Sequence, residues 1–196
     1  MTRVVELLQL RPSRTLQLKP QMNTRFIAAS DAAQHARQVG SAGALFVGGD
    51  GSRKALVMEV TKELFDCWHD DETKIAQLEL CVVLMSMAVW APQMRHHHGI
   101  WWVDNIAALM ALVRGRSRNE ELDSMAGLIH TILFSMGGTC FFEWVASPDN
   151  WADGISRDGL QDEWYRRHNF TPSTFAPPLI LLQLPCLIVC RIFQFL

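Results

Sequence analysis

The sequence predicts an α/β fold in which helices pack on a mixed β-sheet. Three strand-like segments come first in the chain, and helices and strands alternate after them, which is typical of a mixed sheet with helical layers. The chain has 196 residues, 49% hydrophobic and 19% charged, which suits one globular domain with its own core. We expect this domain over 25–168, after a basic arm or linker at 1–24 and before a hydrophobic tail at 169–196.

The first three strands are expected to form an antiparallel meander. Arg25–Asp31, Gly43–Gly48 and Lys54–Val60 are largely apolar runs of strand length. The second run ends in Gly48-Gly49-Asp50-Gly51, a strong hairpin turn. This turn predicts that the second and third strands are neighbours.

A long helix is expected to follow the meander. Apolar residues recur at helical spacing from Ile75 to Val89, and Thr73 is the expected N-cap. Pro92 and Gly99 close the segment. The remaining elements are predicted in this order: a central strand at Ile100–Val103, a short helix at Ile106–Val113, a longer helix capped by Asn119, a fifth strand at Thr139–Val145, and a last helical segment from Asn150.

Charge and cysteine content narrow the class of protein. The net charge of -2 and the pI near 6.4 are less basic than in a protein that coats nucleic acid. Any contact with nucleic acid must therefore come from local basic patches. The five cysteines are scattered, without a Cys-x-x-Cys pair, which fits reduced thiols in the cytoplasm or nucleus. The N-terminus lacks a secretory pattern.

Four carboxylates stand near the ends of predicted elements, and each has apolar neighbours. Asp31 closes the first strand, and Asp104 ends the fourth. Glu79 lies near the start of the long helix, and Asp153 lies in the last helical segment. Hydrolysis of a phosphodiester by two metal ions needs carboxylates that converge from different elements. If the fold brings these four together, they form an acidic cage for Mg²⁺ or Mn²⁺, and the protein is a nuclease.

Each of the four acids also has a simpler structural explanation. Asp104 would serve as the cap of the short helix that follows, Asp31 as a turn aspartate, and Glu79 as part of a salt bridge at the rim. With Asn150 as an N-cap, Asp153 would occupy the third helical position and complete a capping box. Geometry separates these explanations, because a metal cage requires the carboxyl groups to lie within metal-sharing distance of one another.

Four short motifs carry a resemblance to a known family. They are Ser30-Asp31-Ala32, the helix start Ile75–Leu80, Val103-Asp104-Asn105, and Asn150–Arg157. In this order and on these elements, they resemble the motifs of the RNase H-like domain of retroelement reverse transcriptases, above all of DIRS-type and related elements. The resemblance runs from about Arg25 to Leu160. The chain departs from the family at Ala76, where the family has Asn, and it lacks the polymerase portion.

The resemblance implies the ribonuclease H fold, a five-stranded mixed sheet flanked by helices, and a role for each acid. Asp31 would bridge two ions, Mg²⁺ or Mn²⁺. Glu79 and Asp104 would complete the site of the ion on the leaving-group side, and Asp153 would hold the ion that activates water.

The same resemblance implies a substrate and a partner. The reaction would be hydrolysis of the RNA strand of an RNA–DNA hybrid, which leaves 5′-phosphate and 3′-hydroxyl ends. The partner would be a reverse transcriptase domain that this chain lacks. The alternative is a catalytically decayed module that only binds nucleic acid or a partner.

Polar and basic residues in and between these motifs suggest contacts with nucleic acid. The residues expected to contact nucleic acid are Asn105, Arg114, Arg116, Arg118 and Arg157. Solvated loop charge is the simpler explanation of the arginines. Trp101 and Trp102 fit opposite faces of a covered strand better than base stacking. The apolar run Leu179–Leu196 is interrupted by Pro185 and Arg191, which favours an unstructured or aberrant tail over a membrane anchor.

Overall fold

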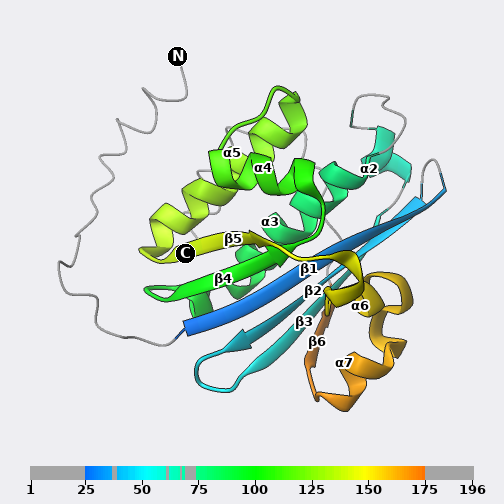
Figure 1. Ribbon diagram of the computed structural model, residues 1–196, viewed down its shortest axis with the longest axis vertical. Helices are drawn as coiled ribbons and strands as arrows, with labels where there is room; N and C mark the ends of the chain where they lie inside the picture. The colour runs from blue at the N-terminus through cyan, green and yellow to red at the C-terminus, as the bar shows by residue number, and fades with distance from the viewer. Residues whose placement is uncertain (1–24, 37–38, 61, 67, 69–73, 175–196) are drawn as a thin grey trace.

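A computed structural model describes the protein at residues 25–36, 39–60, 62–66, 68 and 74–174 (Figure 1). The basic arm at 1–24, the expected cap Thr73 and the apolar run Leu179–Leu196 lie outside these residues.

One mixed sheet forms the centre of the described fold. Its strands are β1 (Arg25–Ala36), β2 (Val39–Gly48), β3 (Arg53–Val60), β4 (His98–Val103), β5 (Thr139–Trp144) and β6 (Thr171–Thr174). Their order across the sheet is β5-β4-β1-β2-β3-β6. β1, β2 and β3 pair antiparallel, which confirms the predicted meander. β4 runs parallel to β1, and β5 runs parallel to β4, so the sheet is mixed as expected.

β6 adds a sixth strand to the five that were predicted. Thr171–Thr174 pairs parallel with β3, with Thr171 opposite Lys54. These residues therefore belong to the sheet and not to the tail expected from residue 169. Four residues that include Pro172 have neither the length nor the alternation that identifies a strand in a sequence. Proline is tolerated here because β6 is an edge strand.

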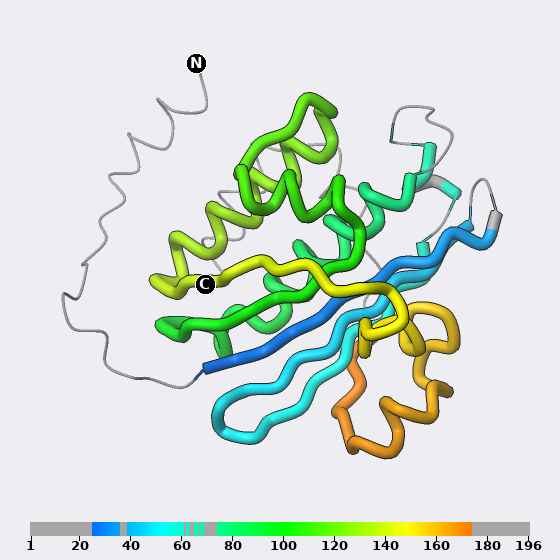
Figure 2. The backbone as a smooth tube through the Cα atoms, in the orientation of Figure 1, coloured from blue at the N-terminus to red at the C-terminus, as the bar shows by residue number. Residues whose placement is uncertain are grey.

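The helices form a layer on each face of the sheet. They are α2 (Lys62–Asp66), α3 (Ile75–Met94), α4 (Ile106–Arg114), α5 (Glu120–Met136), α6 (Asp153–Asp158) and α7 (Glu163–Arg167). α3, α4 and α5 share a core with one face, whereas α6 and α7 pack on the other (Figure 1). Figure 2 shows the chain leaving β5 and passing to the side of the sheet where α6 and α7 lie.

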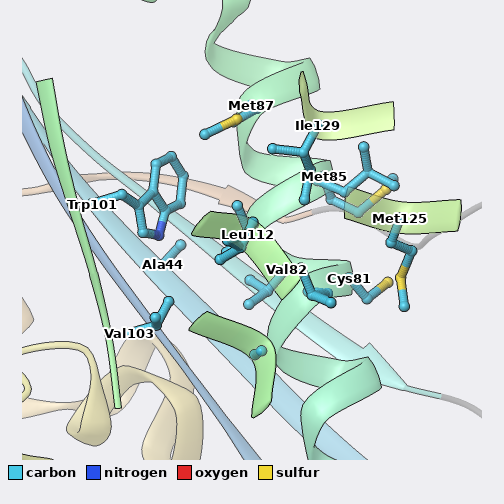
Figure 3. Packing of buried hydrophobic residues seen from close by; sticks show 14 of the residues in the cluster. Ala44, Cys81, Val82, Met85, Met87, Trp101, Val103, Leu112, Met125 and Ile129 are labelled. Atoms are coloured by element: carbon cyan, nitrogen blue, oxygen red, sulfur yellow. The ribbon is translucent and has the colours of Figure 1, made fainter. Parts of the chain in front are cut away.

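The larger core lies between α3 and the sheet. Trp90 of α3 and Trp101 of β4 are fully buried and stack with ring centroids 6.2 Å apart. Figure 3 shows Trp101 and Val103 of β4 facing the helices that carry Met85 and Leu112. α3 has a mean hydropathy of 1.7 and enough length to cross a membrane, yet 72% of the apolar stretch is buried inside the protein. Core packing therefore accounts for its apolar composition.

A smaller core lies under α6 and α7. Ala29 and Leu45 of the sheet pack there with Ile155 of α6. Trp102 is half-buried beside this core, whereas its neighbour Trp101 is buried on the α3 side. The two tryptophans thus point to opposite faces of β4, as the strand pattern predicts.

Two helix starts and two helix ends follow local signals. Asn105 caps α4 and Asn119 caps α5 through their side-chain oxygens. Gly115 (φ 64°) and Gly137 (φ 63°) end the same helices in the left-handed conformation that favours glycine.

α3 extends beyond the residue that was expected to close it. Pro92 lies inside the helix, which ends at Met94. A proline removes one intrahelical hydrogen bond, and burial of Met94 in the core favours the extra residues. At the other end, the Lys74 N–H donates to Gln34 Oε1 at 3.1 Å, and among the described residues no side chain caps the first turn of the helix.

Candidate metal centre

Three of the four predicted acids converge at one end of the sheet. One carboxylate oxygen from each of Asp31, Glu79 and Asp104 lies within 4.8 Å of the other two. Strand register explains half of this arrangement, because Ala29 of β1 pairs with Trp102 of parallel β4. Asp31 and Asp104 each follow that pair by two residues, and they therefore lie at the same end of the two strands.

α3 brings the third acid to this end of the strands from the face of the sheet on which it packs. Glu79 is 1% exposed, and its Oε1 accepts a hydrogen bond of 3.1 Å from the Ala32 N–H of β1. Such burial excludes the rim salt bridge that was the simpler explanation of Glu79. Its Oε2 is also buried and has no hydrogen-bond partner among the described residues.

The environment of Glu79 disfavours its ionised form. Burial raises its pKa well above the ordinary value, and the negative charges of Asp31 and Asp104 raise it further. While both acids are ionised, Oε2 lacks a donor, but a proton on Glu79 would allow a hydrogen bond to Asp104. A bound cation would satisfy the same oxygen without a proton.

Asp31 lies within β1 and not in a turn. The strand was expected to end at this residue, but it continues to Ala36 because β2 pairs with it along that length. Asp31 is 5% exposed, and its carboxylate accepts a hydrogen bond from the Ser156 hydroxyl.

The pKa of Asp31 reflects opposing influences. Burial is the largest influence and raises the pKa, whereas the hydrogen bond from Ser156 lowers it. The net result is a pKa of about 6. The charges of Asp104 and Asp153 raise it, and Arg157 lowers it. Like charges nearby are therefore part of what makes the ionised site costly in the absence of a cation.

Asp104 is free of the capping role proposed for it. The cap of α4 is the next residue, Asn105, whose Oδ1 accepts from the Ala108 N–H at 3.0 Å. The Asp104 carbonyl accepts from Trp144 Nε1 at 3.2 Å, which fixes its backbone while the half-buried carboxylate faces the other two acids. Asn105 was predicted to contact nucleic acid, and in the structure its side chain caps α4.

Asp153 stands apart from the three converging acids. It begins α6, and its carboxylate pairs with Arg157 at 2.7 Å. The predicted capping box does not form, because Asn150 Oδ1 accepts from the Ala152 N–H just before the helix. Asp153 still lies close enough to raise the pKa of Asp31.

The predicted basic contacts are exposed. Arg114 is the last residue of α4, and Arg116 and Arg118 lie in the connection to α5. Arg157 is exposed on α6, where it pairs with Asp153.

Residues that support Asp31 were missed in the sequence. Ser156 lies in the Asn150–Arg157 motif, of which only Asp153 was assigned a role at the metal centre. Gly43 begins the apolar run that was predicted as the second strand. The signal available was the Ser-Arg pair of the Asn150–Arg157 motif, but nothing in the spacing showed that Ser156 faces β1.

The residues fit a divalent cation. The donors are carboxylates only, which suits Mg²⁺ or Mn²⁺ better than softer metals. The buried Glu79 Oε2 lacks a partner, and three mutually repelling acids are held together from three elements. A cation at this position would relieve both features.

Comparisons with known proteins identify the fold. No protein-family model matches the chain, and a search of curated proteins finds no match. RNase H1 from the halophilic archaeon Halobacterium salinarum is similar in structure, with a TM-score of 0.52, 17% identity, and coverage of 70% of this chain and 98% of that one. The N-terminal RNase H domain of a Mycobacterium tuberculosis protein has a TM-score of 0.53, 12% identity, and coverage of 75% and 100%. The chain therefore has a ribonuclease H-like fold.

Proposed function

We propose that this chain is a divalent-metal-dependent endonuclease that hydrolyses the RNA strand of RNA–DNA hybrids. One observation carries the proposal: oxygens of Asp31, Glu79 and Asp104 lie within 4.8 Å of one another on three elements of a ribonuclease H-like fold. The carboxyl edge of parallel strands is where open α/β sheets place their sites, and paired metals on carboxylates are suited to phosphodiester hydrolysis.

Each acid is assigned a place around two ions, Mg²⁺ or Mn²⁺. Asp31 would ligate both ions, Glu79 and Asp104 would complete the site on the leaving-group side, and Asp153 would hold the ion on the water side. When bound, the ions supply Lewis-acid stabilisation of the charged oxygens and lower the pKa of the attacking water.

The surrounding residues prepare these acids for metal binding. The Ala32 N–H holds Glu79 Oε1, and the indole of Trp144 holds the backbone of Asp104. Within the described part of the chain, Asp153 pairs with Arg157, whose side chain is 62% exposed. An exposed pair of this kind is worth less than about 1 kcal/mol, so releasing Asp153 toward the site costs little.

Substrate and context complete the proposal. Arg114, Arg116 and Arg118 are exposed and suited to contact phosphates. The motif resemblance favours an origin in a retroelement and a reverse transcriptase domain as partner. The scattered cysteines favour action in the cytoplasm or nucleus.

The direct test is cleavage of a labelled RNA–DNA hybrid with Mg²⁺. We expect the RNA strand to be cut to products with 5′-phosphate ends, and Asp31→Asn or Asp104→Asn to lower the rate by at least about a hundredfold, because each removes a ligand charge. Asp158→Asn is the matched control, since Asp158 is exposed at the end of α6. A folded parent protein that binds the hybrid but cuts nothing with Mg²⁺ or Mn²⁺ would support the decayed module instead.

A further inference from the structure

The segment that carries α6 is fastened to β1 before the helix begins. Asn150 Nδ2 donates to the Ser30 carbonyl at 3.0 Å, and Asn150 Oδ1 accepts from the Ala152 N–H at 3.1 Å. Asn150 is 4% exposed, so these bonds are shielded from water. They fix α6 beside the residue that precedes Asp31.

α6 also lies unusually close to the sheet. Gly43 of β2 pairs with Asp31 of β1. A Cβ at Gly43 would lie 2.7 Å from Ile155 Cγ2 and 3.0 Å from the Ser156 nitrogen. Only glycine allows the helix to approach to this distance without a shift, so Ile155, the third residue of α6, packs directly against the strand pair that carries Asp31.

Ser156 is the α6 residue that reaches the candidate metal centre. Its side chain is buried, and its hydroxyl donates to Asp31 Oδ2. The same hydroxyl lies 2.8 Å from the Asp153 carbonyl, but one proton serves one acceptor, and the charged carboxylate is the stronger one. On its other side, the Ser156 carbonyl accepts from Ser41 Oγ at 2.5 Å.

We propose that Ser156 is a positioning residue for the metal centre: its hydroxyl fixes the orientation of the Asp31 carboxylate so that Asp31 meets the cation together with Glu79 and Asp104. The inference rests on the proposed metal-dependent function and adds a residue to it. Groups that hydrogen-bond to metal ligands commonly govern affinity, because they set the orientation of the ligand before the ion arrives.

A comparison within the chain separates this role from ordinary helix packing. Ser135 of α5 donates to the carbonyl three residues earlier, Ile132, at 2.7 Å. Ser156 has the same option in the Asp153 carbonyl, yet it also reaches a carboxylate on another element. Ser135→Ala therefore removes the local bond alone and is a matched control for Ser156→Ala.

The test is binding of Mn²⁺ to the full chain, measured by electron paramagnetic resonance or calorimetry. We expect Ser156→Ala to weaken Mn²⁺ binding by about 10- to 100-fold, and Ser135→Ala to leave it within about twofold. Ser156→Cys keeps the volume with a weak donor and should fall between Ser156→Ala and the parent. In cleavage assays, the Mg²⁺ concentration for half-maximal rate should rise with Ser156→Ala, while the rate at saturating Mg²⁺ falls less.

The outcomes are distinguishable. If Ser156→Ala or Ser156→Cys melts within a few degrees of the parent and binds Mn²⁺ as tightly as the parent does, the positioning role is overturned while the nuclease function stands. If the parent itself neither binds Mn²⁺ nor cleaves a hybrid, both proposals fail. A rate loss that is equal at all Mg²⁺ concentrations would also count against positioning, because it would reflect packing.

Discussion

At the scale of single residues, the main feature is a set of acids placed where ionisation is costly. Glu79 is buried, and one of its oxygens has no partner among the described residues. Asp31 is nearly as buried and has two other acids close by. Stability alone does not favour such an arrangement. A cation that holds the acids together gives it a physical reason.

This placement predicts how the stability of the metal-free protein depends on pH. Burial raises the pKa of Asp31 from 3.8 to about 6 and the pKa of Glu79 in the same direction. The folded state therefore holds these protons more tightly than the unfolded state. Protonation of Asp31 and Glu79 therefore stabilises the fold below about pH 4. This stabilisation is lost as the pH rises through the pKa values that the two acids have in the folded state.

The expected change is large enough to measure. For Asp31 alone, a rise from 3.8 to about 6 corresponds to a loss of up to about 3 kcal/mol between pH 4 and pH 7. Urea unfolding in EDTA should show this loss in the parent, and Asp31→Asn should lack it. Glu79 loses the influence of the Asp31 charge in the variant, so the difference between the two proteins measures Asp31 together with its coupling to Glu79. A difference that does not change with pH would contradict the raised pKa.

At the scale of elements, local signals and through-space contacts act on different parts of the fold. The cap Asn119 and the terminal glycines Gly115 and Gly137 act within one turn, so the sequence indicated where α5 begins and where α4 and α5 end. The cap of α4 is Asn105 and not Asp104, one residue from the expected position. The position of α6 depends instead on contacts with β1 and β2, which are more than a hundred residues earlier in the chain.

Gly43→Ala tests that position. Its Cβ would meet Ile155 and Ser156, so we expect α6 to move away, the protein to lose about 1–3 kcal/mol of unfolding free energy, and cleavage and Mn²⁺ binding to weaken. Urea unfolding measures the loss of stability, a Mn²⁺ titration measures the weaker binding, and the hybrid cleavage assay measures the lower activity.

Gly127→Ala is the control, because a Cβ at this helical glycine meets no atom within 4 Å. It should raise stability by about 0.5–1 kcal/mol through helix propensity and leave Mn²⁺ binding unchanged. Equal behaviour of the two variants would show that the close approach of α6 is not needed.

At the scale of the whole molecule, positive and negative charges nearly balance. The net charge is -2, so long-range attraction of nucleic acid is weak, and local groups must provide the affinity. Arg114 ends α4, the helix that begins just after Asp104, and Arg116 and Arg118 follow in the connection to α5. All three arginines are exposed. We propose that these arginines contact phosphates of the substrate.

Replacing Arg114, Arg116 and Arg118 together with alanine should weaken binding of an RNA–DNA hybrid. We expect the slope of log affinity against log salt to fall by about 2 to 3, because each phosphate contact releases close to one counterion. Fluorescence anisotropy in EDTA at several salt concentrations measures this without cleavage. Unchanged affinity and slope would show that these arginines are solvated loop charge, and Mn²⁺ affinity should be unaffected in either case.

The sequence by itself determined the order of the main elements, the meander, the cap Asn119 and the candidates for the metal centre. These features depend on periodicity, turn residues and motif spacing, all of which act along the chain. Tertiary structure decided which acids meet. Strand register set Asp31 beside Asp104, and the packing of α3 brought the buried Glu79 to the same place. Asp153 pairs instead with Arg157. Tertiary structure also placed Ser156 against Asp31 and added β6 to the sheet. A hydrogen bond to a distant strand and the pairing of a short strand with a sheet edge both depend on residues far apart in the sequence, so local patterns do not predict them.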